Sequence, residues 1–97
     1  MNIPDFAAYE AAALARGFDE VAERTWPANS EAPTHTHPFS VDALVVQGEM
    51  WLTAHGATRR LVAGDTFQLD LAVEHAERYG PDGATYWAAR RKAPATA

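Results

Sequence analysis

The glycines from residue 48 onward constrain the fold of the chain more than any other feature. Gly48, Gly56 and Gly64 follow one another at intervals of eight residues, and a GPDG segment comes later, at residues 80–83. Short strands separated by turns at such regular intervals are typical of an antiparallel sandwich or barrel. We therefore expect tight hairpins at Gly48 and Gly56, and a β-turn at residues 80–83.

The first part of the chain has a different character. Residues 4–16 are rich in alanine, begin with Pro4 and are followed by Gly17. This combination predicts a short helix, because alanine favours the helical state, proline suits the first turn and glycine suits the stop. Residues 18–26 predict a strand, and residues 27–33 predict a loop.

The length and composition of the chain predict one domain with a small core. The chain has 97 residues, and 47% of them are hydrophobic, but many of these are alanines that bury little area. Aromatic side chains must therefore supply much of the apolar burial. A second subunit often supports such a core, so we expect a homodimer. The prediction is a single domain over residues 1–97, with a barrel over about 18–91 and a disordered tail over about 92–97.

Charge and cysteine content exclude several classes of function. The formal net charge of −5 argues against binding to nucleic acid or to an anionic membrane. The basic cluster at residues 90–92 is interpreted as part of the solvated tail. The lack of cysteine excludes disulfides, thiolate nucleophiles and cysteine-ligated metals. No signal segment or membrane-spanning apolar run is evident, so we expect a cytoplasmic protein.

Two of the four histidines lie one residue apart, in the segment PTHTHPF at residues 33–39. On a strand, His35 and His37 would point to the same face and present two imidazoles to one point in space. The flanking prolines argue against a helix here. The pair is either half of a metal site or two solvated histidines at a strand edge.

A longer pattern links this pair to a third histidine. The HTH segment precedes a strand that leads to Gly48, and Gly64, Asp65 and Phe67 precede His75. In this order and spacing, the two motifs resemble those of the cupin superfamily, specifically its small, single-domain, RmlC-like members. The resemblance covers roughly residues 18–91. It implies an all-β fold, an antiparallel double-sheet jelly-roll barrel, here with one short N-terminal helix. It also implies a divalent metal inside the barrel, and homodimers.

The chain departs from the cupin pattern where the family usually carries a glutamate ligand, four or five residues after the second histidine. Val41 and Asp42 occupy these positions. On a regular strand Val41 shares the face of His37 and Asp42 does not, so Asp42 is a weak candidate ligand that needs a bulge to point inward. A second departure is the lack of the usual proline and glycine before His75.

The expected metal ligands are therefore His35, His37 and His75. Three neutral imidazoles leave the full charge on a divalent ion and leave coordination positions open. Imidazole suits Fe, Zn, Ni and Cu, so the ligands do not choose among these metals. The resemblance to three-histidine cupin dioxygenases implies Fe(II) for an O2-dependent oxidation of a small molecule.

Other residues are weaker candidates. Glu77 alternates with His75 and is expected either to orient a ligand histidine, to act as a general base, or to pair with Arg78 or Arg59 at the barrel rim. His55 is expected to be solvated in a hairpin turn. Four aromatic residues are expected in the core or in a pocket wall: Phe39, Trp51, Phe67 and Trp87. Two functions remain open: a metal-dependent enzyme with a small-molecule ligand in the barrel, or a non-catalytic cupin that binds or senses a ligand, with a vestigial or empty metal site.

Overall fold

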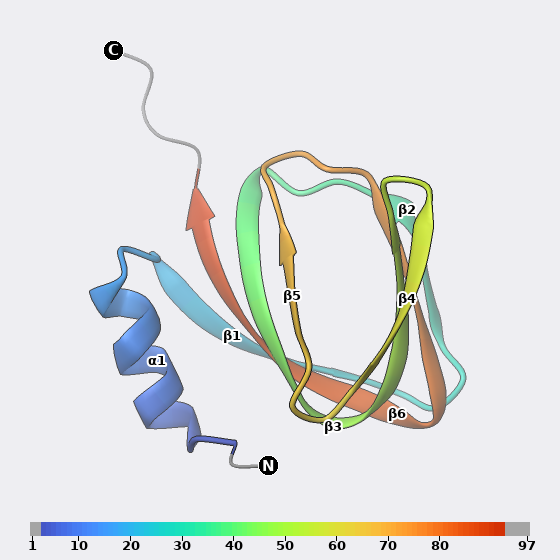
Figure 1. Cartoon of the computed structure of the whole chain (residues 1–97), viewed down its shortest axis with the longest axis horizontal. Helices are drawn as coiled ribbons and strands as arrows, with labels where there is room; N and C mark the ends of the chain where they lie inside the picture. Colours follow the sequence, from blue (N-terminus) through green and yellow to red (C-terminus); the bar gives the residue numbers. More distant parts are fainter. Residues whose placement is uncertain (1–2, 93–97) are drawn as a thin grey trace.

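The structure is a computed structural model that describes residues 3–92, which form one helix and six strands (Figure 1). The elements in chain order are α1 (Phe6–Ala15), β1 (Glu20–Trp26), β2 (Glu31–His35), β3 (Phe39–Ala54), β4 (Ala57–Val62), β5 (Thr66–Leu69) and β6 (His75–Lys92). Within these residues, no helix has the length and hydropathy needed to cross a membrane.

Two long antiparallel strands, β3 and β6, form the centre of the sheet, and both bend (Figure 1). In one half of this pair, β1 lies beside β6 and β5 lies beside β3. In the other half, β2 lies beside β6 and β4 lies beside β3. The predicted all-β, antiparallel, two-layered fold with one short helix is therefore confirmed. The sheet is not closed by hydrogen bonds across residues 3–92, so the predicted barrel is an open one.

Two glycines, Gly48 and Gly83, lie close together where the register of β3 with β6 shifts. Gly48 (φ 83°) and Gly83 (φ 68°) adopt left-handed backbone conformations, which side chains disfavour. A Cβ atom on Gly48 would lie 2.1 Å from the carbonyl oxygen of Gly83. The hairpin predicted at Gly48 and the β-turn predicted at residues 80–83 are therefore wrong. Both strands continue through these positions, and the glycines permit a close crossing rather than a chain reversal.

The hairpin predicted at Gly56 is confirmed. His55 (φ 54°) and Gly56 (φ 75°) form the two-residue connection between β3 and β4, and positive φ at both residues is the signature of a type I′ turn. This turn matches the twist of the flanking strands. His55 is exposed at its tip, as the sequence predicts.

The N-terminal helix covers the outer face of the β1–β6 half. The Asp5 carboxylate caps it by accepting a hydrogen bond from the backbone N–H of Ala8, at 2.7 Å. Phe6 and Tyr9 pack on the ring of Trp87, with centroid distances of 5.3 Å and 5.6 Å. The helix predicted over residues 4–16 is thus confirmed, and it anchors on an outward-facing side chain of β6.

The predicted loop at residues 27–33 is too long, because β2 begins at Glu31 and includes Pro33. Proline is tolerated there since β2 pairs with β6 only and needs no donor on its other side. At the other end of the chain, Lys92 is the last residue of β6. The disordered tail predicted to follow it falls on residues 93–97, which lie outside the described residues.

Candidate metal centre

Three histidines from different parts of the chain meet on one side of the open barrel. His35 is the last residue of β2, and His75 is the first residue of β6, directly opposite it in the ladder. His37 lies in the connection that follows β2, so it does not share a strand with His35 as the sequence predicts. The ring centroids are 4.3 Å apart for His35 and His75, 4.7 Å for His35 and His37, and 5.1 Å for His37 and His75.

The spacing of the ring nitrogens suits a single metal ion. One nitrogen of each histidine lies within 4.8 Å of the other two. Two nitrogens bound to zinc at about 2.1 Å with tetrahedral angles are about 3.4 Å apart, so small rotations of the rings bring these atoms to bonding distance. Imidazole nitrogens fit Fe, Zn, Ni or Cu, and the donor set therefore fits the expected divalent ion without selecting among these metals.

Hydrogen bonds to the backbone orient two of the three rings. Nδ1 of His35 lies 2.6 Å from the carbonyl oxygen of Pro33, and Nδ1 of His75 lies 2.9 Å from the carbonyl oxygen of Val73. A carbonyl oxygen only accepts, so each Nδ1 carries the proton and donates. The tautomer that results leaves the Nε2 lone pair of both rings free for a metal.

The surroundings of His37 favour its neutral form. Burial lowers the pKa of His37, and the nearby His35, His75, Arg90 and Arg24 lower it further. Its ring stacks on that of Phe39, with the centroids 4.9 Å apart. A neutral imidazole is the form that binds metals, so at neutral pH this ring is ready to act as a ligand.

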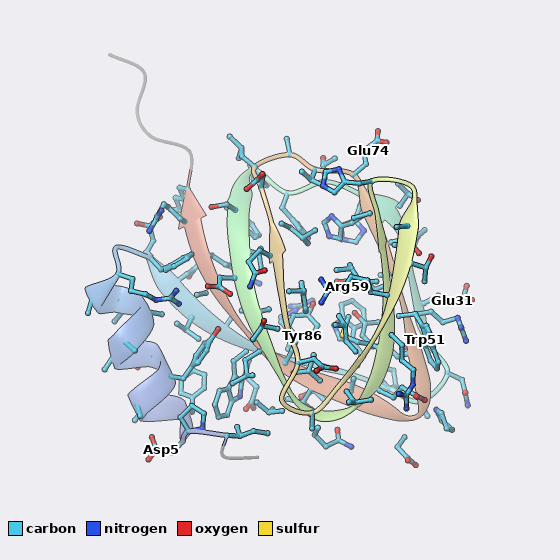
Figure 2. The ribbon with its side chains drawn as sticks, in the orientation of Figure 1. Asp5, Glu31, Trp51, Arg59, Glu74 and Tyr86 are labelled. Carbon is cyan, nitrogen blue, oxygen red and sulfur yellow. The ribbon has the colours of Figure 1, made fainter. Side chains whose placement is uncertain are left out.

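A cavity of about 280 Å³ adjoins the three histidines between the two halves of the sheet. Its remaining wall combines apolar and aromatic side chains with three charged ones. The lining residues besides the histidines are Arg24, Trp26, Phe39, Val41, Phe67, Leu69, Glu77, Tyr86, Ala88 and Arg90. Figure 2 shows the labelled Tyr86 between the halves of the sheet. The cavity offers a small molecule an apolar enclosure beside a metal site.

Glu77 faces this cavity, as the alternation with His75 predicts. Its side chain is buried, with 6% exposed. Among the described residues it makes no ion pair, and its predicted rim partners are engaged elsewhere: Arg78 lies over the ring of Trp51, and Arg59 donates to the carbonyl oxygen of Thr66. Glu77 is therefore placed to contact a bound ligand rather than to brace the rim.

Asp42 and Val41 occupy opposite faces of β3. Val41 lines the cavity, whereas the Asp42 carboxylate accepts hydrogen bonds from Arg16 and Gln68, each at 3.1 Å, on the outer face. No bulge turns Asp42 inward, because the register of β3 with β5 is regular at this point. The structure thus brings the three histidines together and leaves Asp42 apart from them.

The four aromatic candidates divide between the two faces of the sheet. Phe39 and Phe67 line the cavity. Trp87 lies under the helix, and Trp51 lies on the outer face beneath Arg78, near β2 and β4 in Figure 2. Only two of the four therefore contribute to a pocket wall.

Sequence reasoning missed two arginines of the cavity. The sequence pattern predicts a solvated tail for Arg90 and no role for Arg24, yet both line the cavity. Arg90 is a residue of β6, so the assignment to a tail is wrong. In β6 the inward positions are odd at His75 and Glu77 but even at Tyr86 and beyond, because the register shifts at the bend. Counting alternate residues from His75 therefore places Arg90 on the wrong face. The alternation of Arg24 with Trp26 was the available signal in β1.

The sequence matches no protein-family model and no curated protein. The structure resembles several solved ones. An RmlC-like cupin from Shewanella frigidimarina NCIMB 400 is 25% identical, with a TM-score of 0.69 over 77% of this chain and 67% of that one. The DMSP lyase DddQ from Ruegeria pomeroyi DSS-3 is 25% identical, with a TM-score of 0.71 over 80% of this chain and 40% of that one. The Schizosaccharomyces pombe Cnp3 cupin domain is 14% identical, with a TM-score of 0.70 over 76% of this chain and 56% of that one.

This chain spans between two fifths and two thirds of the length of these proteins. They include an enzyme and a domain named only for its fold, so the fold they share does not fix a reaction. The TM-scores show that this chain shares its overall fold with them. From its topology and these likenesses, the chain has the cupin fold.

Proposed function

We propose that this protein binds one divalent metal ion through Nε2 of His35, His37 and His75, and that the cavity beside the metal binds a small molecule. The observation that carries the proposal is the convergence of three imidazoles, two of them fixed by backbone carbonyls with Nε2 free. Solved structures of this fold include a DMSP lyase and a predicted oxalate decarboxylase, so the fold is compatible with enzymatic chemistry on a small molecule.

The ion would supply Lewis acidity to an oxygen atom of the bound molecule. The protein's own groups would do the rest. Phe39, Phe67 and Val41 would exclude water from the bound molecule, since they form an apolar wall of the cavity. Glu77, the one carboxylate in that wall, would accept a proton from the ligand or return one.

Fe(II) would make this site suitable for an O2-dependent oxidation. The absence of a carboxylate at Val41 supports that version, because three neutral ligands leave coordination positions open for both O2 and a chelating substrate. The same absence supports a second candidate, a non-catalytic binding protein, because fewer anionic ligands hold the metal less tightly. Incubation of the iron-loaded protein in air with a small molecule that binds to it separates the two candidates: conversion of this molecule supports the enzyme, and full recovery supports the binder.

Metal titration of single variants tests the proposal. We expect one zinc or cobalt ion per chain in the wild type, and loss of tight binding in His35→Ala, His37→Ala and His75→Ala, since two imidazoles hold an ion poorly. His55→Ala is the matched control: it removes an exposed histidine at the tip of a turn and should keep full loading. Full loading of His75→Ala would refute the three-histidine site.

A further inference from the structure

We propose that Arg24 and Arg90 form a carboxylate-binding site in the same cavity, so that the ligand is a small organic acid. One end of this acid would bind the arginines, and an oxygen at its other end would face the metal. The metal end of the proposal rests on the function proposed above, whereas the arginine end rests on separate observations.

The first observation is that both guanidinium groups belong to the cavity wall and lie on aromatic rings. Cζ of Arg90 is 5.0 Å from the centroid of the Phe39 ring, and Cζ of Arg24 is 5.2 Å from that of Trp26. Phe39 and Trp26 line the same cavity. A guanidinium held over a ring by cation–π attraction keeps N–H groups available for the two oxygens of a carboxylate.

The second observation is a pair of buried donors without partners. Within residues 3–92, neither Nε of Arg90 nor Nε1 of Trp26 has a hydrogen-bond partner. Buried donors are nearly always satisfied in native proteins, so a ligand that lets these two side chains turn their N–H groups towards the cavity would gain hydrogen bonds. Both groups are donors only, and a ligand that satisfies them must therefore bring oxygen atoms that accept.

The third observation is an excess of positive charge. Two carboxylates belong to the surroundings of the arginines: Glu77 lines the same cavity, and Glu20, which is itself mostly exposed, lies 3.6 Å from Arg90. Arg24 makes no ion pair with any described residue. With a divalent ion bound, two positive charges would remain uncompensated at neutral pH. An anionic ligand restores the balance in a partly buried site.

The size and wall of the cavity favour a carboxylate over a phosphate. A volume of 280 Å³ is about nine times the roughly 30 Å³ share of one water molecule, enough for a ligand of about ten non-hydrogen atoms. Much of the wall is apolar, and the cavity is not formed at a helix N-terminus, where phosphates commonly bind. Two guanidiniums beside an apolar wall suit a planar monoanionic group with a short carbon chain.

Calorimetric titration of the zinc-loaded protein with oxalate, malonate, succinate and glutarate tests the proposal. Zinc has no redox chemistry, so the acids are not oxidised. We expect at least one acid to bind, and Arg90→Gln to weaken it by about tenfold or more, the usual effect of losing a hydrogen-bonded charge. Arg24→Gln should weaken it less, because Arg24 is more exposed. Arg90→Lys should retain part of the affinity, since it keeps the charge without the planar fork.

Arg78→Gln is the matched control. It removes the same charge from β6, but on the outer face, where Arg78 lies over Trp51, and it should leave acid binding unchanged. Equal affinity in Arg90→Gln and Arg78→Gln would overturn the proposal. So would the failure of all four acids to bind at about millimolar concentration. Tighter binding of inorganic phosphate than of every acid would overturn the assignment to a carboxylate.

Metal content, measured after each titration, separates this proposal from the metal function. If the arginine variants keep zinc and lose acid binding, the arginine site is supported by itself. If zinc fails to bind the wild type but an acid still binds with dependence on Arg90, the metal function is wrong and the arginine site stands. If zinc binds and the affinity for the acid is the same in the wild type and in both arginine variants, the metal function stands and the arginine site is wrong.

Discussion

Single side chains decide what the cavity can bind, and Val41 is the most informative of them. It occupies the inward position four residues after His37, where cupins usually carry a glutamate ligand, and it lines the cavity. Asp42, one residue later, is held on the outer face by Arg16 and Gln68. The chain therefore has a carboxylate near the right place in sequence but on the wrong face of the strand.

Val41→Glu should add a fourth ligand. We expect zinc affinity to rise by about tenfold or more, because a carboxylate adds both a bond and a compensating charge. The metal-free variant should be less stable than the wild type, since it buries a charged group without a partner. Competition titration against a chelator measures the affinity, with Asp42→Glu as the matched control on the outer face. An affinity in Val41→Glu no higher than that of the wild type would contradict the assigned geometry.

At the scale of the elements, the bends in β3 and β6 determine which of their side chains face inward. The glycines at 48 and 83 were expected to end strands, and they instead let β3 and β6 cross closely while continuing. Because the register shifts there, the inward face changes from odd to even residue numbers in both strands: Val41, Ala43 and Val45 precede the bend in β3, and Met50 and Leu52 follow it.

This change of parity explains which parts were predictable from the sequence. The helix, the type I′ hairpin and the antiparallel fold follow from local signals that act within a few residues. The face of Arg90 depends on a bulge between it and His75, and a bulge is set by contacts between strands far apart in sequence. The proximity of His35 to His75 followed from the resemblance to the cupin motifs, and no local pattern predicts it.

Substitution of two glycines tests whether the close approach of β3 to β6 requires glycine at position 48. Gly48→Ala should destabilise the protein by about 3 kcal/mol or more, because it adds both a left-handed backbone conformation and a collision with the Gly83 carbonyl. Gly56→Ala should cost only about 1 kcal/mol, since it has the same sign of φ but nothing within 4 Å of the added carbon. Urea unfolding measures both. Equal losses in the two variants would show that strain alone, without close crossing, explains the glycine at 48.

The docking of α1 gives a pH-dependent signature. The Tyr9 hydroxyl donates to the carbonyl oxygen of Asp42 at 3.0 Å, and burial together with the Asp42 carboxylate raises the pKa of Tyr9 to about 12, against the opposing effect of Arg16. In the unfolded chain this pKa is about 10. Between these values the unfolded state releases a proton that the folded state keeps, so stability falls as the pH rises through this window.

Tyr9→Phe should remove that part of the pH dependence. We expect the variant to be less stable than the wild type by about 1 kcal/mol at about pH 8, from the lost hydrogen bond, and the difference to shrink by about pH 11. Tyr79 and Tyr86 are present in both proteins, so the comparison isolates Tyr9. Urea unfolding at the two pH values measures it. A difference that stays constant or grows towards high pH would contradict the assigned shift.

At the scale of the whole molecule, the small core and the open sheet bear on assembly. The sheet has unpaired edges among residues 3–92, and such edges are usually covered in native proteins. We propose a homodimer, which would cover part of this surface. Sedimentation equilibrium at tens of micromolar protein, about the range of weak association, should give twice the chain mass. A single-chain mass at that concentration would rule the dimer out.

The most direct test of the central claim is a crystal structure of the zinc-loaded protein, with the ion located by its anomalous scattering. The account predicts one ion per chain, bonded to Nε2 of His35, His37 and His75 at about 2.0–2.1 Å, with Nδ1 of His35 and His75 still donating to the backbone. An ion held instead at His55 and Glu74 near the β3–β4 turn, or no ion at saturating zinc, would contradict it.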